Sequence, residues 1–193
     1  SEWSNCIFEE SNLLPNGALL YLVHNVRGSI SSASFDSLIF QNNKASIGGG
    51  AGFVVAGIAK RISFRTLQFI NNELTGDFGG AISLKDDSGS APTIISFSQC
   101  SFRNNKADGK PGGSIYIDSD TELNLDGCTF DSQIDINLPN LGGAINIEKA
   151  NVTLDSCIFN GMNAGDGYAI YFTGNQQNDR LQILDCVFTD CGP

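Results

Sequence analysis

The sequence lacks the features on which several functional classes depend. No apolar run approaches the roughly 18 residues that a membrane-spanning helix needs, so we expect no membrane insertion. Lys and Arg number 11 against 21 Asp and Glu, and the resulting net charge of −10 disfavours nucleic acid, whose phosphates require basic surface. His24 is the single histidine and has no spaced partner, so it has little support as a general base. No signal peptide is visible, and Ser1 is compatible with a mature N-terminus left by cleavage.

A repeat of about 30 residues runs through the chain. Its most regular mark is a phenylalanine that closes a Cys-x-Phe or Leu-x-Phe step, and these phenylalanines are 28 to 33 residues apart. They are Phe8, Phe40, Phe69, Phe102, Phe130, Phe159 and Phe188. Alternating apolar runs precede each step, and a glycine-rich step such as Gly142-Gly-Ala-Ile145 follows most of them. Such a period is typical of a solenoid, in which every unit packs on its neighbours and none has a core of its own.

The repeat predicts one all-β domain over residues 1–193, a right-handed parallel β-helix of about six turns of roughly 30 residues. Each unit is expected to contribute three short strands, because side chains two apart share a face in an extended chain. Each strand then pairs in parallel with its counterpart one turn away, about 4.8 Å along the axis. The approximate units are 1–29, 30–58, 59–91, 92–119, 120–149, 150–178 and 179–193.

Stacking of the units places similar residues above one another in columns. Asn42, Asn71 and Asn104 predict an asparagine ladder at a bend, with inward amides that bond backbone groups and one another; solvated turn asparagines are the alternative. The Gly-Gly pair predicts a corner with φ > 0 or a close backbone approach, altered where Tyr168 replaces the second glycine. Besides the repeat phenylalanines, the predicted inward columns are Phe35, Phe64, Phe97, Leu125, Leu154 and Ile183, and Cys6, Leu38, Leu67, Cys100, Cys128, Cys157 and Cys186.

Two short motifs resemble the repeat pair of chlamydial polymorphic membrane proteins. Phe-x-x-Asn occurs at 40–43, 69–72 and 102–105, and Gly-Gly-Ala-Ile occurs at 79–82 and 142–145. The resemblance covers nearly the whole chain and extends to other surface β-helix proteins of the pectin-lyase-like fold. It implies a surface-exposed, adhesive passenger. The chain departs from the motif at Gln133, Met162 and Cys191, where the family would place Asn.

Aspartates near the bends are the main candidates for chemistry. Enzymes of the pectin-lyase-like fold are similar to one another in clustering Asp with Arg, Lys or His on one face. Here Asp36, Asp126 and Asp155 precede the cysteine column by two residues and Asp185 by one, but Arg65 and Ser98 interrupt this stripe. Aspartate favours bends for backbone reasons, and Ca²⁺ binding by the stacked part is the alternative. We assign no catalytic, cofactor-binding or metal-binding residue and expect a chain that is not an enzyme and holds no cofactor.

The cysteines and one sequon bear on the cellular compartment. Neighbouring cysteines of the column fall within the Cα range of a disulfide, although parallel Cβ vectors disfavour bridging, so thiols and bridges both stay open. Cys191 stands outside the column and is close to Cys186 in the sequence, where a local Cys186–Cys191 bridge would pin the last turn. Asn151-Val-Thr153 is the single glycosylation sequon and predicts a glycan at Asn151 of a secreted protein.

Neither end of the chain shows the polar cap with which solenoids usually cover their terminal turns. We expect the first unit to lack its leading strand and the last unit to lack its Gly-Gly strand. We therefore predict a non-enzymatic structural protein, secreted or on the cell surface, whose copies stack head to tail into a filament or scaffold. The predicted inter-subunit contacts are Trp3, Cys6, Cys186, Phe188 and Cys191. The alternatives are an adhesin that binds a host protein or glycan through the loops 85–93 and 173–180 and, with least support, a polysaccharide lyase or hydrolase.

Overall fold

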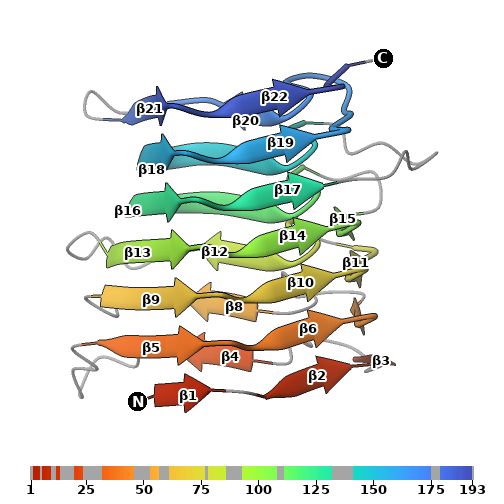
Figure 1. Ribbon diagram of the computed structural model, residues 1–193, viewed down its shortest axis with the longest axis vertical. Helices are drawn as coiled ribbons and strands as arrows, with labels where there is room; N and C mark the ends of the chain where they lie inside the picture. The colour runs from red at the N-terminus through yellow and green to blue at the C-terminus, as the bar shows by residue number, and fades with distance from the viewer. Residues whose placement is uncertain are drawn as a thin grey trace.

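The computed structural model describes residues 2–4, 6–9, 12–13, 20–23, 32–45, 53–56, 61–76, 78–85, 93–107, 111–131, 141–174 and 179–192. Within these residues the chain forms 22 β-strands and no helix. The strands wind into a coil whose turns lie one above another, with the N-terminus at one end and the C-terminus at the other (Figure 1).

A complete turn passes through four faces, which we number in chain order. Face 1 contains β1 (Glu2–Ser4), β5 (Ala33–Asp36), β9 (Arg61–Arg65), β13 (Thr93–Ser98), the second halves of β16 (Ile115–Asp126) and β18 (Ile145–Asp155), and β21 (Arg180–Leu184). Face 2 contains β2 (Ile7–Glu9), β6 (Ile39–Gln41), β10 (Gln68–Ile70), β14 (Ser101–Arg103), β17 (Thr129–Asp131), β19 (Ile158–Asn160) and β22 (Val187–Thr189). Face 3 contains β3 (Asn12–Leu13), β7 (Lys44–Ala45), β11 (Glu73–Leu74) and β15 (Lys106–Ala107). Face 4 contains β4 (Leu20–Val23), β8 (Phe53–Ala56), β12 (Ile82–Lys85), the first halves of β16 and β18, and β20 (Ile170–Phe172).

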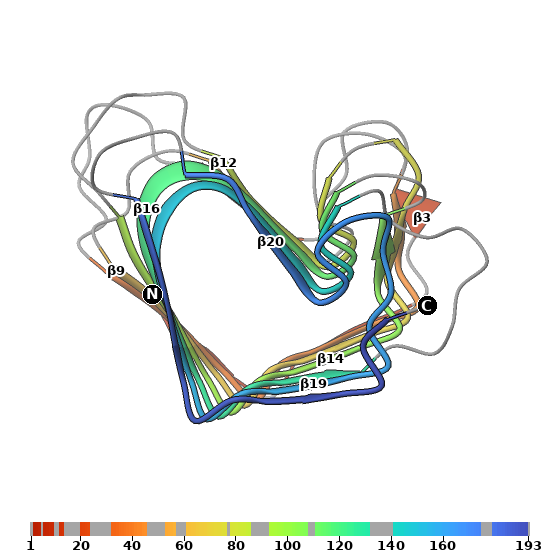
Figure 2. The same cartoon turned by 90° about the horizontal axis from the view of Figure 1, so that it is seen from above.

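Every strand pair within these faces is parallel, and the register follows the repeat. On face 2 the repeat phenylalanines are register partners from Phe8 to Phe188. Seen along the axis, successive turns superpose, and the outline is indented beside the face that carries β12 and β20 (Figure 2). The predicted all-β parallel solenoid is therefore confirmed.

Five strands are additional to the sequence prediction: the four short strands of face 3 and β1. The strands of face 3 give the turns that contain them four strands where three were expected, and their inward residues Ala45, Leu74 and Ala107 are buried. Two residues are too few to show an alternating pattern, so no pattern in the sequence indicates these strands. The first unit also has its leading strand, because Trp3 of β1 pairs with Phe35 of β5. The expectation that this strand is missing is wrong.

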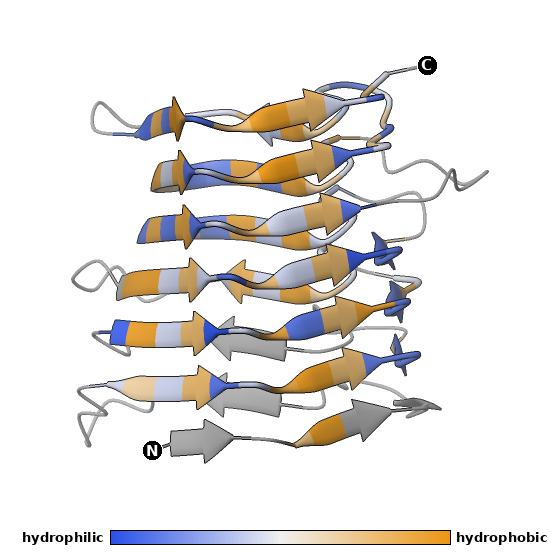
Figure 3. Ribbon diagram, viewed as in Figure 1, coloured by the Kyte–Doolittle hydropathy of each residue, from blue (hydrophilic) through white to orange (hydrophobic). Residues whose placement is uncertain are grey.

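Stacked phenylalanine rings fill the centre of the coil. On face 2 the ring centroids of Phe69, Phe102 and Phe130 are 5.0 and 4.7 Å apart, with interplanar angles of 3° and 4°. On face 1, Phe64 and Phe97 stack at 4.5 Å, and Phe97 meets the edge of Phe102 at 6.0 Å. The spacing of the rings follows from the roughly 4.8 Å between neighbouring strands. Apolar residues accordingly recur at matching places in successive strands (Figure 3).

The Gly-Gly corner satisfies both conditions that the sequence suggested, one at each glycine. The first glycine has a positive φ, 72° at Gly112 and 62° at Gly142, where a side chain is unfavourable. A Cβ on the second glycine, Gly113, would collide with the carbonyl oxygen of Gly143 in the next turn. Tyr168 replaces the second glycine in the last described turn of face 4. No described turn lies beyond this one, so no described carbonyl oxygen of a next turn meets the Cβ atom of Tyr168.

Candidate functional surfaces

The structure contains two asparagine ladders, one residue apart. Asn42, Asn71 and Asn104 lie on the outside with φ between 52° and 55°, and their side chains bond one another: Asn71 Nδ2 donates to Asn42 Oδ1 at 3.0 Å and Asn104 Nδ2 to Asn71 Oδ1 at 3.2 Å. The inward orientation predicted for this set is therefore wrong. The inward ladder consists of the next residues, Asn43, Asn72 and Asn105.

The inward ladder secures the bend between faces 2 and 3. Asn72 Nδ2 donates to Phe40 O and to Asn105 Oδ1, both at 2.9 Å, and Asn72 Oδ1 accepts from Asn43 Nδ2 at 2.9 Å. Asn105 repeats the pattern by donating to Phe69 O at 2.8 Å. In later turns Met162 is buried at the corresponding place, and the thiol of Cys191 lies 3.6 Å from Phe159 O. This column is thus polar at one end of the coil and apolar at the other.

The cysteine column precedes face 2. Cys100, Cys128 and Cys157 are buried, Cys186 is half-buried at the C-terminal end, and Cys6 is half-buried at the N-terminal end. None of the six cysteines forms a disulfide in the structure. Cys186 and Cys191 lie on either side of the three residues of β22, and no disulfide joins them. The structure therefore does not contain the local bridge that would pin the last turn.

Contacts between the thiols change their acidity. The neighbouring thiol Cys128 lowers the pKa of Cys100, whereas the neighbouring thiol Cys100 raises the pKa of Cys128 to about 12. The neighbouring thiol Cys128, followed by burial, raises the pKa of Cys157. Burial is the main cause that raises the pKa of Cys186. The folded state therefore holds most of these thiols in the protonated form.

Replacing Cys128 by leucine, the residue that the column has at 38 and 67, is expected to reduce the loss of stability at high pH. Since the folded-state pKa of Cys128 lies above its ordinary value of 9.0, its contribution is complete below pH 9 and is lost as the pH rises toward 12. Urea unfolding at about pH 8 and about pH 10.5 measures this loss for both proteins. Equal losses in the two proteins would contradict the assignment.

The C-terminal end of the coil exposes core residues. Ile183 and Phe188 continue two inward columns, yet their side chains are 44% and 45% exposed, whereas Leu154 and Phe159 one turn below are fully buried. The ring of Phe188 stacks on Phe159 at 4.8 Å with its other side uncovered by any described residue. Strand β22 is largely apolar (Figure 3). This surface, which we call the open end, comprises β21 and β22.

The five predicted inter-subunit residues lie at both ends of the coil. Cys186 and Phe188 lie at the open end, and Cys191 packs at its margin against the core. Cys6 precedes β2 at the opposite end, and Trp3 lies in β1, where only the backbone is described. The five residues therefore lie at the two opposite ends of the coil. Figure 1 shows β1 at one end and β22 at the other.

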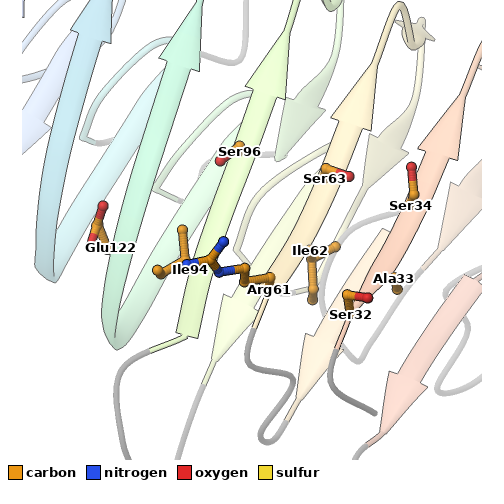
Figure 4. A pocket seen from close by; sticks show the side chains of 9 residues that line it. All are labelled: Ser32, Ala33, Ser34, Arg61, Ile62, Ser63, Ile94, Ser96 and Glu122. Carbon is orange, nitrogen blue, oxygen red and sulfur yellow. The ribbon is translucent and has the colours of Figure 1, made fainter.

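A shallow polar groove runs over the outside of face 1. Its larger part, about 480 Å³, lies across β5, β9, β13 and β16 (Figure 4), and a second part of about 220 Å³ lies across β16, β18 and β21. Glu122 lines both parts. The outward residues that line both parts are Ser32, Ser34, Ser63, Ser96, Thr153, Gln182, Arg61, Ile94, Glu122, Asn151 and Arg180. The alternating outward serines are the only signal of this groove in the sequence, and none of the predicted site residues was assigned to a groove.

Asn151 lies in this groove. Its side chain is exposed on β18, next to Glu122 and Arg180, which are its register partners on either side. Thr153, the hydroxyl residue of the sequon, points to the same side because it is two residues further along the strand. A glycan on Asn151 remains a prediction, and this is the surface that it would occupy.

The aspartates at the bends bond with neighbouring hydroxyl groups. Ser37 Oγ and Thr66 Oγ1 each donate to Asp36 Oδ1 at 3.1 Å, and Ser156 Oγ donates to Asp155 Oδ1 at 2.9 Å. Asp126 and Asp155 are register partners, with Ser98 and Arg65 following in the same row. No group of three or more His, Cys, Asp or Glu side chains suited to a metal occurs in the described part of the chain. His24 and most of the loops 85–93 and 173–180 lie outside the described residues.

A polar row on the outside of face 4 is buried, which the sequence did not indicate. Ser83, Tyr116, Asn146 and Tyr171 are register partners, and the ring of Phe78 stacks on Tyr116 at 4.6 Å. Ser83 and Asn146 are fully buried, and neither Ser83 Oγ nor the amide atoms of Asn146 have a hydrogen-bond partner in the structure as described. Alternation marks these positions as outward, so only the fold shows that they are covered.

Comparison with known proteins agrees with this geometry. A family model described as a right handed beta helix region matches residues 31–193. No curated protein and no solved structure gives a significant match. The described residues include no helix with the length and apolar character of a membrane span. Because the family model covers most of the chain, and because the strands pair in parallel throughout, this protein belongs to the right-handed β-helix family.

Proposed function

We propose that this chain is a non-enzymatic structural protein, secreted or on the cell surface, whose coil is continued by a second copy stacked head to tail. The observation that carries the proposal is the open end. Phe188 is 45% exposed where its counterpart Phe159 is fully buried. Aromatic surface of this kind is worth about 25 cal/mol for each Å² that leaves water, so a covering turn would stabilise it.

The opposite end of the coil offers a matching surface. Strands β1 and β2 lie on faces 1 and 2, the faces to which β21 and β22 of the open end belong. Phe8 pairs in register with Phe40 and so occupies the same column as Phe188. Ile7, the exposed outward residue of β2, continues the row that includes Ile158 and Val187. A second copy that lands in register would therefore extend every column of faces 1 and 2 without a change of pattern.

Backbone groups at the two ends also complement each other. In the coil, Ser156 N donates to Leu184 O across one step of face 1, and Val187 N donates to Cys157 O at the start of face 2. Strands β21 and β22 have no described strand beyond them, so one edge of each is open for pairing. Contact between unlike ends is heterologous and does not close on itself, which leads to a filament.

Replacing Phe188 by aspartate is expected to abolish concentration-dependent association. Sedimentation velocity over a range of concentrations should show the unmodified chain growing into longer species and Phe188→Asp remaining monomeric. Ile158→Asp is the matched control, since Ile158 is also 45% exposed but lies on the outside of face 2, one strand below the terminal strand β22. Circular dichroism checks that both variants fold. A monomeric unmodified chain at every concentration, or association that persists in Phe188→Asp, would overturn the proposal.

An adhesin is the second candidate, and the groove on face 1 favours it. The groove offers hydroxyl, amide, carboxylate and guanidinium groups across six strands, a mixture suited to a hydroxyl-rich glycan. The segments before β13 and β21, which contain the two irregular loops, lead directly into this face. The similarity of the Phe-x-x-Asn and Gly-Gly-Ala-Ile motifs to those of chlamydial polymorphic membrane proteins also supports adhesion. Glycan binding by the monomeric Phe188→Asp variant, without any self-association of the unmodified chain, is the outcome that selects this function.

A further inference from the structure

Four thiols follow one another without interruption at the C-terminal half of the cysteine column. Cys100, Cys128, Cys157 and Cys186 occupy equivalent places, one residue before face 2. Their Sγ atoms share one orientation, because each lies 3.1 to 3.5 Å from the carbonyl oxygen two residues earlier. Equal orientation on parallel strands in register means that consecutive Sγ atoms repeat at the strand spacing of about 4.8 Å.

This spacing matches the span of two metal–sulfur bonds. A thiolate–metal bond is about 2.3 Å long, so a linear sulfur–metal–sulfur unit spans about 4.6 Å. Soft monovalent ions accept linear coordination by two thiolates. Among metal ions, soft sulfur ligands select Cu(I). Ions that need three or more protein ligands have no suitable group among the described residues.

One of the three gaps in this row can be reached from solvent. Cys100, Cys128 and Cys157 are fully buried, whereas Cys186 is half-buried and belongs to the open end. An ion that enters at the open end meets Cys186 first and Cys157 one turn below it. The carbonyl oxygens of Leu184 and Asp155 beside the two Sγ atoms hold both side chains in this orientation.

We propose that Cys157 and Cys186 form a two-coordinate site for a soft monovalent metal ion, Cu(I) in the first instance. Binding breaks two S–H bonds, forms two S–Cu bonds and releases two protons to solvent, and no electron is transferred. The site carries one negative charge when loaded, and the half-exposed position of Cys186 leaves that charge in contact with water. The inference goes beyond the structural role and does not depend on stacking of copies.

The test is an anaerobic titration of the reduced full-length chain with Cu(I), supplied as its acetonitrile complex, at a protein concentration where the chain is monomeric. The expected result is an ultraviolet thiolate-to-copper absorption that saturates at one ion per chain and is lost in Cys186→Leu. Leucine keeps the apolar packing that the column has at 38 and 67, so loss of the fold does not explain the effect, and circular dichroism checks this.

Two controls isolate the pair. Cys6→Ser should bind as the unmodified chain does, because the neighbour of Cys6 in the column is Leu38, which offers no sulfur. Cys191→Ser should do the same, because Cys191 lies beyond β22 in a different column. Absence of the absorption in the unmodified chain, or saturation that survives Cys186→Leu, would overturn the inference. Neither result bears on the association measured with Phe188→Asp.

Discussion

Replacing Phe102 by alanine is expected to lower the free energy of unfolding by about 3–5 kcal/mol. The side chain is 1% exposed, and its ring contacts three others: Phe69 at 5.0 Å, Phe130 at 4.7 Å and the edge of Phe97 at 6.0 Å. The cavity cannot close by movement of one neighbour, because the rings above and below are held at the strand spacing by backbone hydrogen bonds. Urea denaturation measures the change.

Phe188→Ala is the control for this prediction. Phe188 belongs to the same column but stacks on one ring and is 45% exposed, so its removal from the monomer should cost about 1–2 kcal/mol. Equal losses for Phe102→Ala and Phe188→Ala would contradict a core built from a stack in which each ring is held from both sides.

Replacing Asn72 by alanine is expected to destabilise the coil by about 3–5 kcal/mol, although the side chain it removes is polar. The amide bonds three partners at 2.9 Å: Phe40 O, Asn105 Oδ1 and Asn43 Nδ2. All lie in the interior, so truncation leaves buried donors and acceptors without hydrogen bonds, at about 1–3 kcal/mol for each group. Thermal and urea unfolding both measure this effect.

The adjacent residue provides a matched control. Asn71 is exposed, and its amide bonds are to Asn42 and Asn104 on the surface. Asn71→Gly keeps the left-handed backbone conformation, φ 53°, and should change the free energy of unfolding by less than about 1 kcal/mol. If Asn71→Gly proved as damaging as Asn72→Ala, the outer ladder rather than the inner one would secure the bend.

The asparagine ladders show where sequence reasoning about this fold succeeds and where it stops. The phenylalanine and cysteine columns were predicted because their spacing survives every insertion in the loops. The inner asparagines were missed by one residue, since strict alternation from Phe40 points Asn42 inward. The left-handed conformation of Asn42, φ 55°, reverses the alternation and turns Asn43 inward instead. A left-handed backbone conformation at a single residue cannot be recognised from a hydropathy pattern.

Some candidate surfaces could also be predicted from the sequence, and others could not. The cysteine row could be predicted because the cysteines recur with the repeat, and the terminal residues because they belong to its first and last units. The groove on face 1 depends on which outward residues meet across six strands, which the sequence signals only through the serines at 34, 63 and 96. The unpaired amide of Asn146 depends on how the chain folds over face 4, and no pattern of residue types records that.

Electron microscopy of the concentrated chain tests the stacking of copies most directly. A single coil has seven strands on face 2 and is about 30 Å long. We predict rods several times this length, with the strand spacing of about 4.8 Å continuing across the junctions between copies. A field of separate rods of single-coil length at every concentration would contradict the account.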